Sequence, residues 1–430
     1  MENFESFGLT VPEILLPAHT DIRTWSVIAC DQYTQDAGYW QKAARETEGR
    51  PSTLNMILPE IYLSAADKKT RIESIKAAMR QYLDSNIFRP AQRKCMYVER
   101  KTGCGRTRRG LVAAIDLEKY DWKPFSKTLI RATEATIEER LPPRMEIRNG
   151  APLELPHIML LVNDKERSLI EKTGEAVRQN EPDYDGDLML NAGHITGWAV
   201  KTEEDLDRIR AALHSIKEQN TDADGNPFLF AAGDGNHSLA TAKAVWDEYK
   251  KAGGTNENVR YALAEIVNIY DPGLTFEPIH RVLFGCNPDR LISFAAEKLG
   301  GTIVQEKTEA SLEEHVKNAE NNFGFVYAEN GKPQYVRLST GITGLAVSRL
   351  QPALDEFMAG KKELAIDYIH GTQEVFRLGK KDGAVCILLP PIAKDSFFET
   401  IARRGPLPRK SFSMGEADEK RFYLECRRLF

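Results

Sequence analysis

The sequence predicts an α/β (α+β) fold with a larger domain over residues 1–284 and a second, smaller α/β domain over residues 285–430. Two observations predict it. Short apolar runs of strand length alternate with segments of helical periodicity, without internal repeats or low-complexity tracts. The 430 residues are also 42% hydrophobic and 28% charged, a composition that can bury a large core and excludes overall disorder.

The first domain is expected to contain one long helix followed by a β-hairpin. A helical pattern runs near residues 60–85, and apolar stretches then predict strands at 95–99 and 111–116. The glycine- and arginine-rich stretch 102–110 lies between these strands rather than before a helix. We therefore interpret it as a hairpin turn and not as a phosphate loop.

Further strands and helices are expected to alternate after the hairpin. Apolar residues predict a strand at 157–162, and helical periodicity predicts helices at 164–179 and 203–218. The acidic stretches 183–187 and 222–225 lack the complete ligand spacing and closing glutamate of a calcium loop. We expect both to be turns.

Two interpretations are open for residues 25–34. A strand that ends at Asp31 and Gln32 would put polar groups at a sheet edge, where the sites of α/β proteins lie. Alternatively, Asp31 or Thr34 caps the start of a helix. Asp31 is therefore a candidate site residue.

The second domain shows a clear order of elements. Residues 288–340 predict a helix, a strand, a second helix and a hairpin around Asn330 and Gly331. These elements are sufficient for a compact α/β unit.

The segment 227–243 gives the strongest local signal. An apolar run meets two glycines that flank an aspartate, and a helical pattern begins just after them, which predicts strand, tight turn and helix. Glycine permits positive φ and close backbone approach, and the amides and dipole of a helix N-terminus favour an anion. The alternative is a surface turn capped by Asn236 or Ser238. The candidate anion-binding residues are Gly233, Gly235, Asn236, His237 and Ser238, with Asp234 as an added acceptor.

Charge and cysteine content exclude several classes of protein. A net charge of −5 and a pI near 6.0 give no electrostatic footprint for nucleic acid or an anionic membrane. No apolar run approaches the ~20 residues of a membrane span, and the N-terminus lacks the basic start of a signal peptide. The six cysteines form no CxxC pair. We expect a cytoplasmic protein with small-molecule substrates, whose oligomeric state the sequence does not indicate.

The glycine turn resembles the DGHHR signature of the free L-serine kinases and their bacterial relatives, a family with the ParB/sulfiredoxin fold. Three further blocks are similar to the family in the same order, so the resemblance spans most of the chain. It implies a ParB/sulfiredoxin-like core. Sulfiredoxin activity is not expected, because the turn has no reactive cysteine. The three blocks are residues 130–136, residues 270–274 with 278–282, and residues 366–371 with 408–411.

The resemblance implies roles for individual residues. Glu134 matches the catalytic glutamate, which would accept the proton of the substrate hydroxyl, and Thr136 matches the threonine two positions later. Asp234 would hold Mg²⁺ or orient the hydroxyl. A segment near the amino-acid carboxylate is matched by Arg409, Lys410 and Ser411, so the C-terminal segment is expected to return to the active site.

Structural alternatives remain open for these residues. Residues 132–140 read as a mixed helix, on which Glu134 would be an exposed carboxylate. Residues 409–411 read equally as a solvated basic tail.

Two departures from the family pattern affect the phosphate site. Thr133 replaces a histidine, and Ser238 replaces the final arginine of the signature. Substitutes for the lost cation are Arg131, Arg148 and Arg281, and His280 is a further ambiguous candidate. No Walker-type phosphate loop is present, so pyrophosphate is favoured over ADP or ATP as the donor.

The resulting hypothesis is a kinase of amino-acid metabolism that converts free L-serine to O-phosphoserine. One alternative is a kinase for another small hydroxy compound. A second is a non-catalytic, nucleotide-binding regulatory protein of ParB-like fold.

Overall fold

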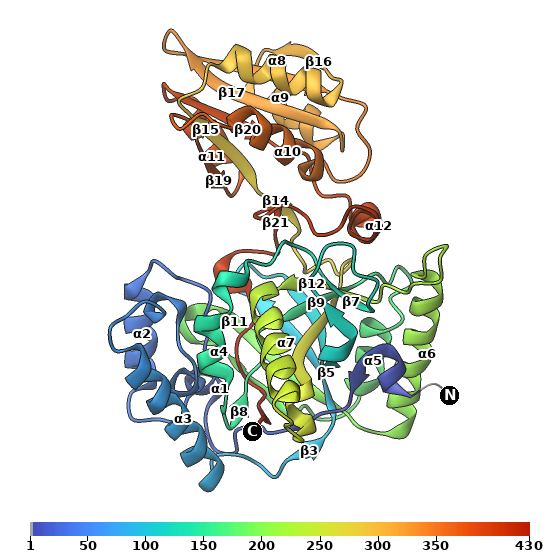
Figure 1. Ribbon diagram of the computed structural model, residues 1–430. Coiled ribbons are helices and arrows are strands. Elements are labelled where there is room, and N and C mark those ends of the chain that lie inside the picture. The colour runs from blue at the N-terminus through green and yellow to red at the C-terminus, as the bar shows by residue number, and fades with distance from the viewer. Residues whose placement is uncertain (1–2) are drawn as a thin grey trace. The chain divides into compact units, whose positions relative to one another are not determined.

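The computed structural model describes residues 3–430, which divide into two compact units (Figure 1). Unit 1 runs to Leu274 and resumes at Gly415–Phe430, and unit 2 is Thr275–Met414. Each unit combines a sheet with helices, so the α/β (α+β) fold class is confirmed. The ParB/sulfiredoxin-like character of the core stays a prediction.

The expected boundary at residues 284 and 285 differs from the observed division. The two strands that lie just before it are β14 (Glu277–Pro278) and β15 (His280–Phe284). They pair with strands of unit 2, which explains why this unit begins at Thr275.

Unit 1 is built on a mixed sheet in the order β10-β11-β4-β5-β13-β9-β12-β7-β6, with β1 also paired to β5. The pairs β9–β13, β7–β12 and β6–β7 are parallel, and the others are antiparallel. The strands are β1 (Leu9–Thr10), β4 (Cys95–Thr102), β5 (Thr107–Asp116), β6 (Tyr120–Asp121), β7 (Ile130–Ala132), β9 (Met159–Val162), β10 (Tyr184–Asp187), β11 (Gly193–Val200), β12 (Phe230–Asp234) and β13 (Tyr261–Asn268).

Helices cover both faces of this sheet. Alternate residues of a strand point to opposite faces, and accordingly Tyr97 belongs to one buried cluster while Met96 and Val98 belong to another. The first cluster contains residues of α5 (Ile170–Val177), α6 (Glu203–Gln219) and α7 (Asn236–Lys251). The second contains residues of α1 (Ile22–Trp25), α2 (Ala37–Thr47) and α3 (Lys68–Asp84), and α4 (Pro142–Arg148) completes the helices of unit 1.

The C-terminal segment of the chain packs into the core of unit 1. Its strand β22 (Arg427–Arg428) pairs with β8 (Leu153–Glu154), while β2 (Glu13–Ile14) pairs with β3 (Gln92–Arg93). The Trp25 indole donates to the Leu424 carbonyl at 2.9 Å, inside the core. Residues from both ends of the chain therefore share one hydrophobic cluster.

Unit 2 has an antiparallel sheet in the order β16-β18-β17-β20-β15-β19. One of its buried clusters includes Val282, Leu312, Val326 and Val375. Its other elements are α8 (Pro288–Leu299), β16 (Thr302–Glu306), α9 (Glu309–Lys317), β17 (Asn322–Glu329), β18 (Lys332–Ser339), α10 (Val347–Met358), β19 (Ala365–Ile369), α11 (Thr372–Gly379), β20 (Ala384–Leu388), α12 (Lys394–Arg404) and β21 (Phe412–Ser413).

Most of the predicted elements are confirmed. The hairpin β4–β5, the strand β9, the helices α3 and α6, and the order α8, β16, α9, β17, β18 all occur as expected. The predicted helix at 164–179 is shorter, because α5 begins only at Ile170.

Two local predictions and one open alternative are wrong. The alternative that residues 132–140 form a helix is excluded, because residues 133–137 are not helical and Glu138–Arg140 form only a 3₁₀ turn. Residues 26–34 form neither the predicted strand nor a helix start, and α2 begins later with Asp36 as its cap. Residues 184–187 form the strand β10 rather than a turn, because they pair with β11.

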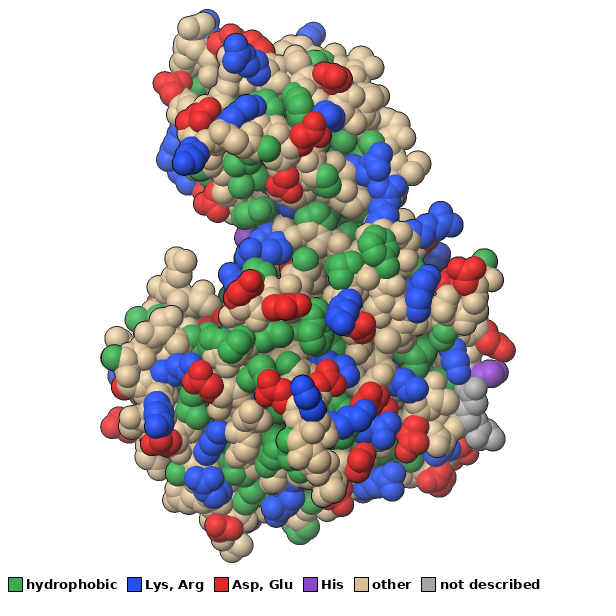
Figure 2. Space-filling model, viewed as in Figure 1, with side chains coloured by type: hydrophobic (Ala, Val, Ile, Leu, Met, Phe, Trp, Pro, Cys, Tyr) green, Lys and Arg blue, Asp and Glu red, His purple; other side chains and the backbone are tan. Residues whose placement is uncertain are grey.

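Basic and acidic side chains are interspersed over the face shown in Figure 2, so that face carries no large field of a single sign. In residues 3–430, no helix is both long enough and apolar enough to cross a membrane.

Candidate functional site

The predicted strand, turn and helix at residues 230–251 are confirmed. β12 ends at Asp234, with a register shift at Gly233, and α7 begins at Asn236. Gly235 has φ +75°, and a Cβ there would lie 3.2 Å from the Ile158 Cα. A left-handed backbone and this close approach together require glycine.

The N-terminus of α7 has no side-chain cap among the described residues. The two residues expected as caps bind elsewhere: Asn236 binds Thr133, and Ser238 binds His157 at 2.7 Å. The positive end of the helix dipole is therefore not neutralised by a cap, which suits it to an anion.

The segment that carries Glu134 is hydrogen-bonded to the first turn of α7. The Thr133 amide donates to Asn236 Oδ1 at 3.2 Å, and Asn236 Nδ2 donates to Thr133 Oγ1 at 3.2 Å. Four residues later, the Ile137 amide donates to His237 Nε2 at 3.4 Å. Glu134 and Thr136 thus lie on a short non-helical segment that is tethered at both ends to the predicted anion site.

Thr136 contributes an unsatisfied polar atom to this segment. Its Oγ1 is buried and has no hydrogen-bond partner among the described residues. Because a buried hydroxyl without a partner is costly, such a group is often completed by a ligand or by water.

A lysine that sequence reasoning missed lies beside the turn. Lys420 Nζ is 3.4 Å from Asp234 Oδ2, and the Lys420 side chain is only 11% exposed. Lys420 comes from the C-terminal segment, far from the turn in sequence and outside every motif, so no local signal identifies it.

The arginines considered as substitutes for the signature arginine have other partners. Arg131 is buried, donates to the carbonyls of Thr128 and Pro227, and lies over the Phe228 ring. Arg148 pairs with Glu154 at 2.6 Å.

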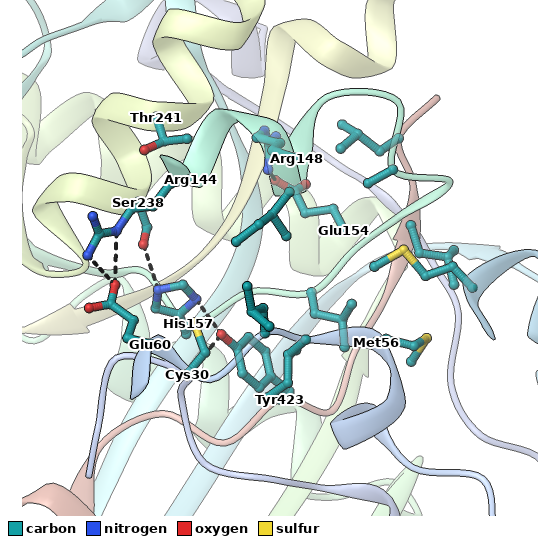
Figure 3. Close-up of a pocket in the computed structure, with 18 of the residues that line it drawn as sticks. Cys30, Met56, Glu60, Arg144, Arg148, Glu154, His157, Ser238, Thr241 and Tyr423 are labelled. Carbon is teal, nitrogen blue, oxygen red and sulfur yellow. Dashed lines mark hydrogen bonds and ion pairs between the residues drawn. The ribbon is translucent and has the colours of Figure 1, made fainter. Parts of the chain in front are cut away.

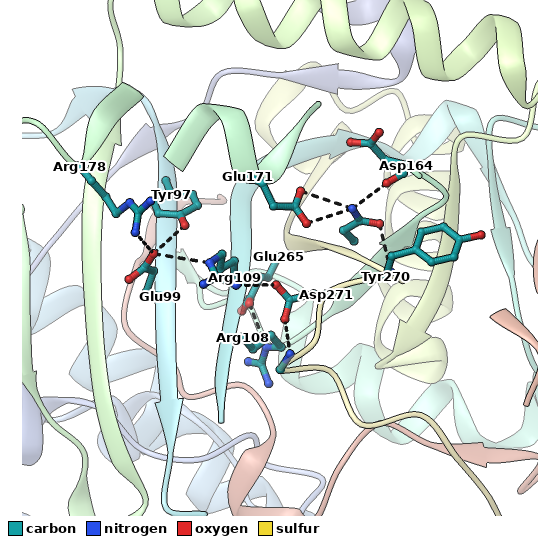
Figure 4. Close-up of polar contacts among 12 residues, drawn as sticks. Tyr97, Glu99, Arg108, Arg109, Asp164, Glu171, Arg178, Glu265, Tyr270 and Asp271 are labelled. Carbon is teal, nitrogen blue, oxygen red and sulfur yellow. Dashed lines mark hydrogen bonds and ion pairs between the residues drawn. The ribbon is translucent and has the colours of Figure 1, made fainter. Parts of the chain in front are cut away.

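The block 270–274 is fixed to the sheet by a polar network, shown in Figure 4. Asp271 is fully buried, accepts from the Gly273 amide at 2.7 Å and lies 3.5 Å from Arg109 Nη1. Burial raises the pKa of Asp271 above its usual value, against the effect of these two donors. A Cβ on Gly273 would lie 2.0 Å from the Thr107 carbonyl oxygen, so a residue with a side chain would clash with the backbone at this position.

A sequence comparison identifies the family of this chain. Residues 14–357 match the family model described as "Protein of unknown function (DUF1015)". The chain belongs to the DUF1015 family. No curated protein matches this DUF1015 chain.

Several solved structures are similar to this DUF1015 protein at low identity. A free serine kinase variant in complex with AMP is 11% identical with a TM-score of 0.39, over 71% of this chain and 88% of that chain. A conserved hypothetical protein from Pyrococcus furiosus is 13% identical with a TM-score of 0.36, over 74% and 97%. C-terminally truncated SbnI from Staphylococcus aureus is 8% identical with a TM-score of 0.36, over 71% and 83%.

The predicted site residues in the blocks 278–282 and 408–411 of this DUF1015 protein lie in unit 2. Arg281 is buried, donates to Gln351 Oε1 at 3.0 Å and to the Lys410 carbonyl at 2.9 Å, and the Ser411 carbonyl accepts from the Ile279 amide at 3.2 Å. The blocks 278–282 and 408–411 are therefore brought together. Arg409 lies in the block 408–411, which belongs to unit 2. Only the residues from Gly415 onward belong to unit 1.

His280 and Asp31 of this DUF1015 chain are held by local contacts. His280 Nδ1 accepts from the Leu389 amide at 3.1 Å, and burial, with Arg281 adjacent, lowers the pKa of His280 to about 3. Asp31 accepts from the Gln32 side chain at 3.0 Å.

The donor set for a metal ion is small. Residues 3–430 contain no group of three His, Cys, Asp or Glu side chains that could hold a metal ion. Asp234 therefore offers one carboxylate, next to Lys420. Mg²⁺ commonly uses one or two carboxylates together with substrate phosphates and water, so Asp234 fits a phosphate-bound Mg²⁺ rather than a cage made of protein ligands alone.

Proposed function

We propose that this protein is a phosphotransferase that phosphorylates the hydroxyl of a small hydroxy amino acid, most specifically free L-serine. The observation that carries the proposal is the double tether of residues 133–137 to the first turn of α7. It keeps the carboxylate-bearing segment next to an uncapped helix N-terminus. General-base catalysis and phosphate binding require these two components side by side.

Each group has a defined part in the proposed reaction. The substrate hydroxyl attacks the phosphorus of the donor, the bond from phosphorus to the leaving phosphate breaks, and Glu134 accepts the hydroxyl proton. The first turn of α7 and Lys420 stabilise the negative charge on the phosphoryl oxygens. Asp234 would hold Mg²⁺, which neutralises donor phosphate charge when bound.

We propose pyrophosphate as the donor ahead of ADP or ATP. A small anion needs only the helix N-terminus, one lysine and a metal ion. The helix N-terminus and Lys420 lie beside Asp234, which would hold the metal ion.

The test is product formation by the purified protein. L-serine and Mg²⁺ are incubated with pyrophosphate, ADP or ATP in separate reactions, and O-phosphoserine is detected by mass spectrometry. We expect product from one donor, and a loss of about 10²-fold or more in rate with Glu134→Gln. Glu139→Gln, an exposed carboxylate in the adjacent turn, is the matched control and should keep the activity.

Two results would contradict the proposal. Absence of product from every donor would exclude serine phosphorylation, and the same assay with other small alcohols would then test the acceptor. Equal activity in Glu134→Gln and the wild type would exclude Glu134 as the base.

A further inference from the structure

A pocket of about 140 Å³ in unit 1 lies against the first turn of α7 (Figure 3). Its body is apolar, and Ser238, His157 and Tyr423 form a polar end. A cavity of about 150 Å³ can hold a molecule of the size of benzene. Apolar lining residues include Met56, Leu58, Met79, Ala151, Leu153 and Leu155.

The polar end is a continuous row of hydrogen bonds. Ser238 Oγ is 2.7 Å from His157 Nε2, and His157 Nδ1 is 2.9 Å from the Tyr423 hydroxyl. The Tyr423 hydroxyl also accepts from the Cys30 amide at 3.2 Å. Four segments that are distant in sequence therefore meet at this end of the pocket.

The tautomer of His157 determines the direction of this row, and we infer it from the neighbouring donors and acceptors. Burial raises the pKa values of both Tyr423 and Cys30, so the phenol and the thiol keep their protons. Sulfur is a weak acceptor, whereas an unprotonated imidazole nitrogen is a strong one. We infer the arrangement in which the phenol donates to His157 Nδ1, the ring hydrogen is on Nε2, and Nε2 donates to Ser238 Oγ.

This direction leaves the Ser238 hydroxyl as a donor at the pocket. Its oxygen accepts from His157, and within residues 3–430 the hydroxyl makes no other hydrogen bond than the one with His157. His157 in this tautomer cannot take the Ser238 proton, so a nucleophilic serine of the hydrolase type is not formed here.

The charged groups that line the pocket are paired with each other. Arg144 Nε lies 2.9 Å from Glu60 Oε1, and Arg148 Nη1 lies 2.6 Å from Glu154 Oε1. The charges in the lining therefore cancel, so no unpaired charge is available to an ionic ligand such as L-serine. One donor of these groups, Arg148 Nε, is buried without a hydrogen-bond partner among the described residues.

We propose that this pocket binds a compact, neutral, largely apolar molecule that carries one hydrogen-bond acceptor, which receives the Ser238 hydroxyl. The pocket adjoins the first turn of α7, to which the proposed function assigns phosphoryl binding, and Ser238 belongs to that turn and to the pocket lining. Its ligand class is a small alcohol, ketone or phenol rather than an amino acid.

The test uses the full-length protein without any phosphoryl donor. Benzyl alcohol, toluene and L-serine are titrated separately, and binding is followed by ligand-observed NMR. We expect benzyl alcohol to bind, with an affinity that falls about three- to tenfold in Ser238→Ala because one hydrogen bond is lost. Toluene should bind the wild type and Ser238→Ala equally. Ser215→Ala, at an exposed position of α6, is the matched control.

A second variant tests the pocket itself. Ala151→Leu adds volume to the lining and should abolish binding of both aromatic probes, while thermal unfolding confirms that the variant is folded. The proposal is overturned if benzyl alcohol does not bind, if Ser238→Ala binds it as tightly as the wild type, or if Ala151→Leu leaves its binding unchanged. Ser238-dependent hydrolysis of phenyl acetate would overturn the deduced hydrogen-bond direction.

Discussion

Gly235 determines both the start of α7 and the approach of the turn to β9. Gly235→Ala should cost about 1–2 kcal/mol for the left-handed backbone and a further amount for the 3.2 Å contact with Ile158. Gly253→Ala, at the other end of α7, is the control because it has φ +81° but no atom within 4 Å of the added Cβ. Urea unfolding should rank Gly235→Ala as the less stable variant, and equal stabilities would exclude a role for the close contact.

Asn236 orders the segment that carries Glu134. In Asn236→Ala, the Thr133 amide loses its acceptor, so hydrogen exchange over residues 133–137 should become faster. Mass spectrometry of the peptides that span this segment measures the effect. Asn287→Ala removes the cap of α8 in unit 2 and should leave that exchange rate unchanged. An unaltered rate in Asn236→Ala would show that the tether does not order the segment.

The elements around the candidate site differ in how well the sequence predicts them. β12 and α7 follow from local residues, because an apolar run, Gly235 and a helical pattern suffice. Residues 133–137 include two strong helix formers, Glu134 and Ala135, beside three β-branched residues. Hydrogen bonds to Asn236 and His237 hold this segment in a non-helical conformation. Such tertiary contacts override local propensity, and no sequence pattern reports them.

A buried ionic row connects the sheet to the C-terminal segment. Glu265 in β13 lies 3.3 Å from Arg108 Nε and 2.7 Å from Arg421 Nη1, and Arg421 also pairs with Glu425. A Cβ on Gly110 would lie 2.4 Å from the Glu265 carboxylate, so β5 leaves space for this group. The row therefore joins β5, β13 and the last residues of the chain.

Replacement of the central carboxylate should strongly destabilise unit 1. Glu265→Gln removes the charge partner of Arg108 and one of the two charge partners of Arg421, both buried, at an expected cost of about 3–5 kcal/mol. Burial alone would raise the pKa of Glu265, but Arg108 and Arg421 lower it below its usual value. The contribution is thus present above about pH 4.5 and is lost as the pH falls through the folded-state pKa.

Urea unfolding at several pH values measures this effect. The difference in stability between the wild type and Glu265→Gln should be largest near neutral pH and should shrink on acidification. Glu204→Gln breaks an exposed pair on α6 and should change stability by less than about 0.5 kcal/mol. A difference that is independent of pH would contradict the assigned role of the carboxylate.

At the scale of the whole molecule, unit 2 has its own sheet and its own buried cluster. A fragment of residues 275–414 should therefore unfold cooperatively, with a single transition by circular dichroism and dispersed NMR signals. A fragment of residues 1–274 should not, because it lacks Arg421 and Arg427, the partners of two buried glutamates. Cooperative unfolding of the second fragment would show that residues 415–430 are dispensable.

The division of the chain is the feature that the sequence conceals most. The alternation of elements predicts the fold class and the order of strands in the hairpins. The family resemblance predicts that the C-terminal segment returns to the active site through residues 409–411. The alternation of elements does not reveal that residues 415–430 belong to unit 1, because Lys420, Arg421 and Tyr423 have partners more than a hundred residues away. Lys420 beside Asp234 and Tyr423 at the polar end of the pocket could therefore not be predicted from the sequence, because both depend on contacts between distant segments.

The split of unit 1 along the chain also has a consequence for biosynthesis. Unit 2 can fold as it leaves the ribosome, whereas unit 1 must wait for residues that emerge after Met414. Protein synthesis adds roughly 5–20 residues per second. The synthesis of the about 140 residues of unit 2 therefore delays the completion of unit 1 by roughly 7 to 28 s. During that interval Glu265 lacks Arg421 and Glu154 lacks Arg427, one of the two charge partners of each. The nascent larger unit is therefore exposed to chaperones and proteases for longer than its size alone would require.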